Sequence, residues 1–81
     1  MQIQIKLFAS LPDHTGQREL VWPVKKDSTV EDVFEEMSRK YPGIAGFKTS
    51  LLFAVNESYV SKNHVMQDGD ELALIPPVSG G

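Results

Sequence analysis

The chain has 81 residues, of which 41% are hydrophobic and 23% are charged, and it contains no cysteine. This length predicts one small domain with little room for a complete catalytic site, which favours a carrier, a binding module or an enzyme subunit. The net charge of -3 argues against nucleic-acid binding, which normally needs a basic surface. No apolar run is long enough to span a membrane and no signal peptide is apparent, so we expect a cytoplasmic protein.

The first quarter of the chain predicts a β-hairpin. Residues 2–8 alternate apolar with polar side chains, which is typical of a half-buried strand, and residues 17–24 resume this alternation. Residues 9–16 are rich in turn formers. Pro23 has no N–H for a strand ladder, so the second strand should lie at a sheet edge with that position facing outward.

One helix is predicted next, from an apolar stripe at helical spacing that comprises Val30, Val33, Phe34, Met37 and Tyr41. Ser28 with Glu31, or Thr29 with Asp32, would form a capping box at its start. The acidic residues between 31 and 36 form a solvated face. Pro42-Gly43 should end the helix.

Three further strands are predicted at residues 51–55, 59–60 and 71–75, the last entered through a turn at Asp68-Gly69. This order gives an α+β fold with one helix packed across one face of a single sheet. If the last strand returns to the centre beside the first, the sheet is mixed and the architecture is a β-grasp. We therefore expect a domain over residues 1–75, followed by an extended tail over residues 76–81.

Strand parity predicts an apolar patch at the base of this tail. If Ile5 and Leu7 face the helix, Phe8 faces away from it, and so does Ile75. Exposed apolar patches usually mark a partner surface. The alternative is that Phe8 lies covered beneath the loop of residues 9–16.

The tail has a composition suited to entering a narrow channel. Two prolines stiffen its start, and the two terminal glycines leave the last carboxylate unshielded. The alternative is an inert, frayed terminus. No metal site is expected, because His14 and His64 lack the spacing of metal ligands.

Four segments carry a resemblance to a known family: Leu7-Phe8-Ala9, Leu52 to Asn56 with Val60, Asp68-Gly69-Asp70-Glu71, and Pro76 to Gly81. Together they resemble the family of small, sulfur-carrying subunits of molybdopterin synthase. That family has a ubiquitin-like β-grasp fold. The chain departs from it at Pro12-Asp13, where many members carry Arg-Glu, which affects the expected loop contacts.

The resemblance implies a chemistry for the tail. An ATP-dependent activating enzyme would adenylate Gly81, and a sulfur donor would replace AMP to leave a thiocarboxylate. The tail would then enter the large subunit of molybdopterin synthase and deliver sulfur to cyclic pyranopterin monophosphate. Gly80 and Ser79 would pass through the channel of the large subunit, while Pro76, Pro77 and Val78 would determine how far the tail extends from the domain. The chain would bind no cofactor itself and have no independent active site, and acid-base groups would come from the partner.

Three other functions remain open from the sequence. The chain could carry sulfur for thiamin synthesis or tRNA thiolation, although the segment Pro76 to Ser79 favours molybdopterin synthase. It could instead be a ubiquitin-like modifier joined to lysines through Gly81, because both fates start from an adenylate. It could also be a plain interaction domain.

Overall fold

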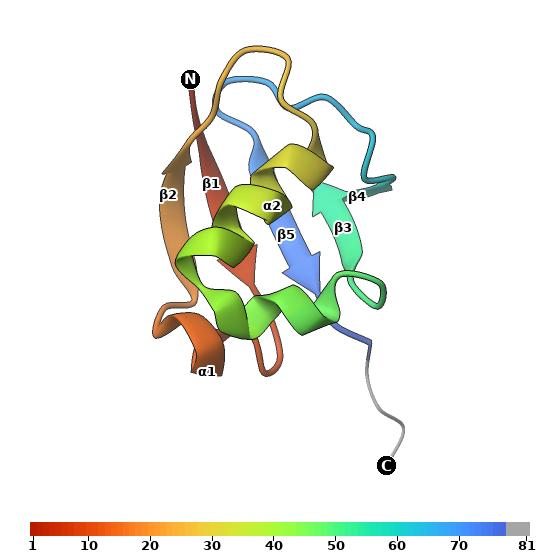
Figure 1. Ribbon diagram of the computed structural model, residues 1–81. Helices are drawn as coiled ribbons and strands as arrows, with labels where there is room; N and C mark the ends of the chain where they lie inside the picture. Colours follow the sequence, from red (N-terminus) through yellow and green to blue (C-terminus); the bar gives the residue numbers. More distant parts are fainter. Residues whose placement is uncertain (78–81) are drawn as a thin grey trace.

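The fold is a five-stranded mixed sheet with one long helix across it. The computed structural model describes residues 1–77. Strands lie in the order β2-β1-β5-β3-β4, with β1 and β5 parallel and the other neighbours antiparallel. The predicted α+β, ubiquitin-like β-grasp with its last strand beside the first is confirmed (Figure 1). The elements are β1 (Gln2–Leu7), α1 (Pro12–Thr15), β2 (Glu19–Pro23), α2 (Val30–Lys40), η1 (Pro42–Phe47), β3 (Leu52–Val55), β4 (Ser58–Val60) and β5 (Glu71–Ile75).

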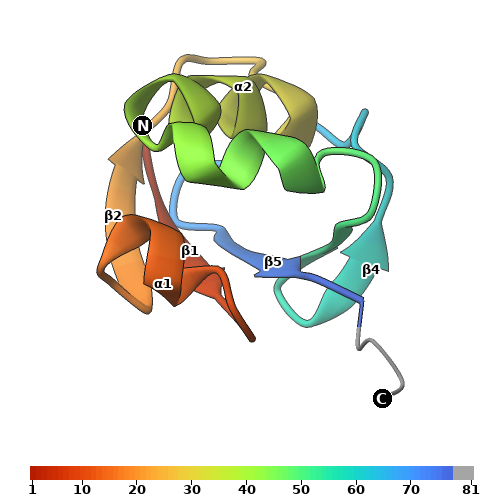
Figure 2. The same cartoon turned by 60° about the horizontal axis from the view of Figure 1, so that its bottom comes forward.

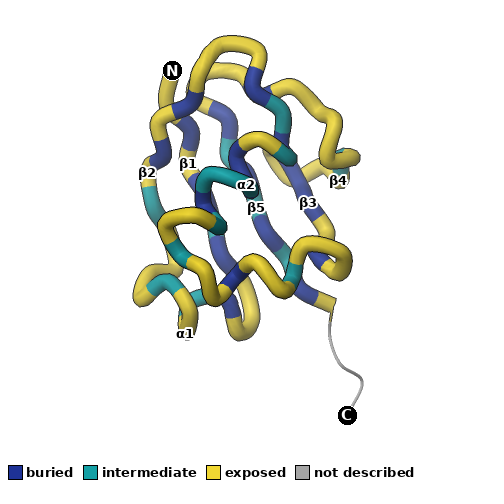
Figure 3. Tube along the Cα trace, in the orientation of Figure 1, coloured by how far each residue is buried: buried dark blue, intermediate teal, exposed yellow. Residues whose placement is uncertain are grey.

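The core lies between α2 and one face of the sheet, while no element of residues 1–77 covers the other face (Figure 2). Figure 3 shows the buried positions along the sheet and the inward side of α2. The apolar positions of the predicted helix stripe and the alternating apolar positions of the first two predicted strands line this core. Leu20 and Tyr41 are only partly buried, whereas the buried ones include Ile3, Ile5, Leu7, Trp22, Val30, Val33, Phe34 and Met37. None of the helices in this part of the chain combines the length and hydrophobicity of a membrane span.

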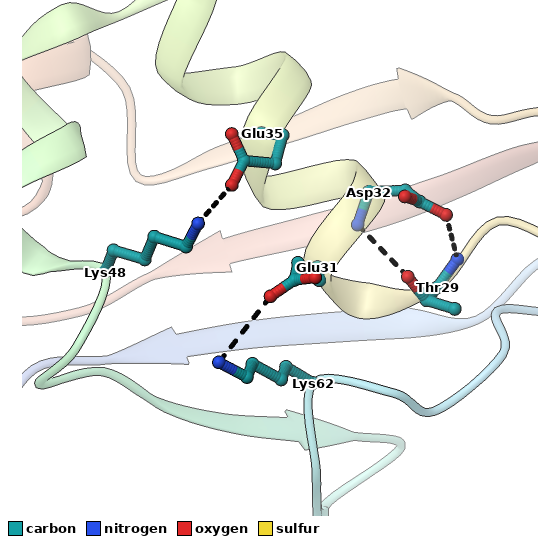
Figure 4. Close-up of polar contacts among 6 residues, drawn as sticks. All are labelled: Thr29, Glu31, Asp32, Glu35, Lys48 and Lys62. Atoms are coloured by element: carbon teal, nitrogen blue, oxygen red, sulfur yellow. Dashed lines mark hydrogen bonds and ion pairs between the residues drawn. The ribbon is translucent and has the colours of Figure 1, made fainter.

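A capping box starts α2, as the sequence predicted. Thr29 Oγ1 accepts a hydrogen bond from the Asp32 N–H at 3.2 Å, and the Asp32 carboxylate accepts one from the Thr29 N–H at 3.0 Å (Figure 4). Of the two boxes that the sequence allowed, the one at Thr29 and Asp32 forms. Ser28 is buried instead, and its carbonyl accepts a hydrogen bond from the Met66 N–H at 2.8 Å.

Replacing the capping hydroxyl should weaken the fold measurably. We expect Thr29→Ala to lower the free energy of unfolding by about 1 kcal/mol, because the Asp32 N–H loses its acceptor. Urea denaturation followed by circular dichroism would measure the change. Thr49→Ala removes the same atoms from an exposed turn and should leave the midpoint nearly unchanged. Equal effects of both substitutions would contradict the assignment of the cap.

Two short helices were not predicted from the sequence. The loop after β1 contains α1, which has Pro12 in its first turn and is capped at its C-terminal end by Gly16, with a φ of 76°. The 3-10 helix η1 follows α2 directly, beginning at Pro42, where a loop was expected. Three strands are shorter than predicted: β1 ends at Leu7, β2 spans five residues, and β3 begins at Leu52. Strand β4 begins one residue earlier than predicted, and β5 has the predicted bounds. Short helices lack an amphipathic repeat long enough to detect, because one turn of helix has too few positions to show a period.

Strand β2 forms one edge of the sheet, as predicted from Pro23. The Leu7 N–H donates to the Arg18 carbonyl at 2.9 Å, and the Val24 N–H donates to the Met1 carbonyl at 2.8 Å. Because hydrogen-bonded positions alternate along an antiparallel pair, the residues whose backbone groups point away from β1 are Glu19, Val21 and Pro23. The missing N–H of proline therefore falls where no ladder bond is needed.

Candidate functional site

The tail leaves the domain from the most enclosed strand of the sheet. Strand β5 pairs with β1 on one side and with β3 on the other. Its inward side chains, Leu72 and Leu74, are fully buried. Pro76 is still buried and Pro77 is exposed, so the chain emerges at Pro77. The remaining predicted tail residues, Val78, Ser79, Gly80 and Gly81, lie outside the described residues, and their roles stay predictions.

The structure brings Phe8 and Ile75 together on the uncovered face of the sheet. Both line an open pocket of about 250 Å³, together with Ala54, Tyr59 and Ala73. Leu52 is the register partner of Ile75 and is 53% exposed. We call this surface the outer patch; it comprises Phe8, Leu52, Ala54, Tyr59, Ala73 and Ile75. It is an apolar surface at the point where the tail begins.

Phe8 is held in place by its backbone. Its N–H donates to the Leu74 carbonyl at 3.3 Å, one residue beyond the end of β1, and its carbonyl accepts from the Leu11 N–H at 3.1 Å. Ala9 then turns the chain with a φ of 54°. The Phe8 side chain remains 45% exposed, so the loop does not bury it. Its use as a partner contact stays a prediction.

A charged pair borders the outer patch. Lys6 Nζ lies 2.6 Å from the Glu71 carboxylate and 3.8 Å from that of Glu19. The hydrogen bond to Glu71, and then its negative charge, raise the pKa of Lys6 above its usual value. Lys6 is therefore charged over the whole physiological range, and the patch has the polar rim that is typical of protein interfaces.

Sequence reasoning missed Leu52, Tyr59 and the two alanines of the outer patch. The alternation of β3 and β5 contained part of the signal: Leu52 and Ala54 have the parity opposite to Phe53 and Val55. However, the register that places Ala54 between Ala73 and Tyr59 depends on long-range pairing. Because Ala54 and Ala73 have small side chains, they leave space for the pocket above them.

The acidic residues before β5 anchor a turn. Asp70 is buried and accepts hydrogen bonds from Asn56 Nδ2 at 2.9 Å and from the Gln67 N–H at 2.7 Å. Asp68 accepts one from the Gln2 N–H at 2.9 Å. Among residues 1–77, no cluster of three or more histidine, cysteine, aspartate or glutamate side chains is arranged to hold a metal ion.

Comparison with known proteins places the chain in a family. The model of the ThiS family matches residues 5–81. The chain belongs to the ThiS family. The resemblance noted in the sequence is thereby confirmed, since a molybdopterin synthase sulfur carrier subunit from Arabidopsis thaliana is 33% identical over this whole chain and 84% of its own length.

Other ThiS-like relatives carry a different name. The small archaeal modifier protein 3 of Haloferax volcanii is 30% identical, with both chains fully covered. The crystal structure of SAMP1 from the same organism superposes with a TM-score of 0.88, at 29% identity and with full coverage of both chains. This chain is therefore similar both to a protein named as a sulfur carrier and to proteins named as modifiers.

Proposed function

We propose that this ThiS-family chain is the sulfur-carrying small subunit of a molybdopterin synthase, with Gly81 as the reacting residue. The observation that carries the proposal is the place where the tail begins: Pro76 and Pro77 follow central strand β5 beside the outer patch. The name of the Arabidopsis relative supports the same function. A rigid strand thus presents the tail, while the neighbouring surface can hold a partner.

The proposed chemistry takes place at the terminal carboxyl carbon. A terminal carboxylate is ionised at neutral pH and is a poor electrophile, so it must be activated. Its oxygen attacks the α-phosphate of ATP on an activating enzyme, which releases pyrophosphate and leaves an acyl adenylate. A donor that supplies sulfur at the level of hydrosulfide then attacks the carbonyl carbon, AMP leaves, and a thiocarboxylate results. Its sulfur forms a C–S bond to cyclic pyranopterin monophosphate inside the large subunit, and water then cleaves the acyl C–S bond, which leaves the sulfur on the substrate and regenerates the carboxylate.

The mass of the intact chain tests this proposal directly. We expect incubation with ATP, a competent activating enzyme and a sulfur donor to replace one oxygen atom by sulfur. Fragmentation in the mass spectrometer should place the change on Gly81. Omitting ATP provides the control, because no adenylate can then form. An unchanged mass in the complete mixture, with an enzyme shown to act on another carrier, would refute the sulfur-carrier function.

The outer patch should supply much of the affinity for the large subunit. We expect Phe8→Ala to weaken this binding by about 2 kcal/mol, or roughly thirtyfold in Kd, because a central aromatic anchor is lost. Isothermal titration calorimetry would measure the change. The matched control is Val65→Ala: Val65 has similar exposure, at 42% against 45%, but lies outside the patch. A similar loss with both variants would contradict the assignment of the surface.

A second function, protein modification through Gly81, is favoured by one observation. The Haloferax volcanii relative named as a modifier protein matches this chain over its full length. The two functions diverge after the shared adenylate: a modifier passes its carboxyl group to a lysine amine and forms an isopeptide bond. Lysine-linked remnants of Ser79-Gly80-Gly81 in peptide digests would support modification.

A further inference from the structure

The basic side chains of this acidic protein divide into two groups. Three of the eight, Lys6, Lys48 and Lys62, form ion pairs with glutamates. Within residues 1–77, no carboxylate forms an ion pair with the other five, which are Arg18, Lys25, Lys26, Arg39 and Lys40. All five flank β2 or lie in the last turn of α2 beside it. Three of them, Lys25, Lys26 and Arg39, line a hollow that also contains Asp27, Asp32, Glu35 and Glu36. Arg18 and Lys40 are the two that lie outside this acidic cluster.

The same side presents an open strand edge. No strand of residues 1–77 pairs with the outer side of β2, and the N–H and C=O groups of Glu19 and Val21 point toward it. Val21 is 62% exposed. At Pro23 only the carbonyl is available. An added strand could therefore form regular hydrogen bonds over Glu19 to Val21 and would end near Pro23.

A groove beside this edge could receive apolar side chains. It has a volume of about 450 Å³. Its apolar lining is Leu20, Val21, Trp22 and Tyr41, and its polar lining is Gln4, Gln17, Glu19 and Lys40. Lys40 Nζ lies 5.7 Å from the centre of the Trp22 ring and 5.6 Å from that of Tyr41. The groove thus combines an apolar strip with polar side chains, among them a lysine that forms no ion pair within the described residues.

The opposite edge of the sheet, formed by β4, differs from the β2 edge in the length of its strand and in the pairing of the lysines near it. Strand β4 has only three residues. The lysines near it are neutralised by α2: Lys48 lies 2.6 Å from Glu35 and Lys62 lies 3.6 Å from Glu31 (Figure 4). At the β2 edge the strand carboxylate is Glu19, which lines the groove and lies 3.8 Å from Lys6 Nζ. The two edges therefore differ in strand length, and Lys40 at the β2 edge lacks the ion pair that Lys48 and Lys62 form.

We propose that the β2 edge binds an extended, acidic segment of a partner protein, which adds to the sheet as a sixth strand. Backbone hydrogen bonds to Glu19 and Val21 would align the segment, its apolar side chains would occupy the groove, and its carboxylates would contact Lys40 and Arg18. In the sheet, β1 and β5 separate β2 from β3 and β4. At one end, Arg18 and Glu19 line a hollow together with Phe8, so the β2 edge adjoins the outer patch there.

A synthetic peptide tests the proposal on the full chain. The probe is an acetylated nine-residue peptide with four valines, one serine and four glutamates. At a concentration about ten times its Kd, we expect amide hydrogen exchange at Glu19 and Val21 to slow about tenfold, with NMR shifts centred on β2. Lys40→Gln should raise Kd by about fivefold, whereas Lys62→Gln at the opposite edge should leave it unchanged.

Two control peptides separate strand addition from general charge attraction. A peptide with lysines in place of the glutamates should bind much more weakly, and one with glycines in place of the valines should lose the protection of Val21. Equal binding of the glycine peptide, or of a single-stranded oligonucleotide, would show a nonspecific anion site and overturn the proposal. Shifts at β4, or no slowing of exchange at Val21, would also overturn it.

Discussion

Deletion of Gly81 is expected to abolish sulfur transfer while leaving the fold intact. In the proposed mechanism, the deletion moves the reacting carboxylate back by one residue, so it no longer reaches the sites that adenylate it and use its sulfur. Loss of one positioned reacting group removes the reaction, since no other carboxyl group of the chain can replace it. The measurement is molybdopterin formation with the large subunit, the activating enzyme and a sulfur donor.

Stability and a second modification provide the controls for this prediction. The thermal midpoint of the truncated chain should match that of the full chain, because the last residue of the hydrophobic core is Leu74. One alanine added after Gly81 should also abolish activity, whereas an added N-terminal tag should not. Normal molybdopterin formation by either C-terminal variant would show that Gly81 does not carry the reacting group.

Leu74→Ala should have the largest effect on stability. Leu74 is fully buried, and its register partners are Leu7 on β1 and Phe53 on β3. The substitution leaves a cavity between the central strands and should lower the free energy of unfolding by about 2–5 kcal/mol. That is a large share of the stability of a domain this small. Urea denaturation monitored by Trp22 fluorescence would measure it.

Leu52→Ala is the matched control for this core substitution. It removes the same atoms from an adjacent strand, but the Leu52 side chain is 53% exposed on the outer patch. We expect its unfolding midpoint to change little, while its binding to the large subunit should weaken. If Leu52→Ala destabilised the fold as strongly as Leu74→Ala, the assignment of inner and outer faces would be wrong.

The main architecture could be predicted because its signals repeat along the chain. The stripe from Val30 to Met37 and the alternation of β1 each place several side chains on one face, so a single ambiguous residue does not alter the pattern. Pro23 added an independent constraint, because a missing N–H is compatible with only a few positions in a sheet. Helix α1 lacks such repetition, and a turn and one turn of helix favour similar residues.

The candidate site was predicted only in part. Phe8 and Ile75 follow from strand parity, since each lies beside buried residues of known face. Leu52 and Tyr59 depend on how β3 aligns with β5 and β4, which long-range packing determines. The chemistry assigned to Gly81 rests on the family and on the tail composition, because no described side chain takes part in it.

The parallel pairing of β1 with β5 has a consequence for how partners recognise this protein. Phe8 directly follows β1, and Ile75 is the last residue of β5. The two side chains therefore come together only after β1 has paired with β5. An unfolded or truncated chain can carry the same terminal glycines without the outer patch. An activating enzyme that binds both the terminal glycines and the outer patch would therefore discriminate against incomplete chains. It would adenylate only folded chains, and no ATP would be consumed on unfolded ones.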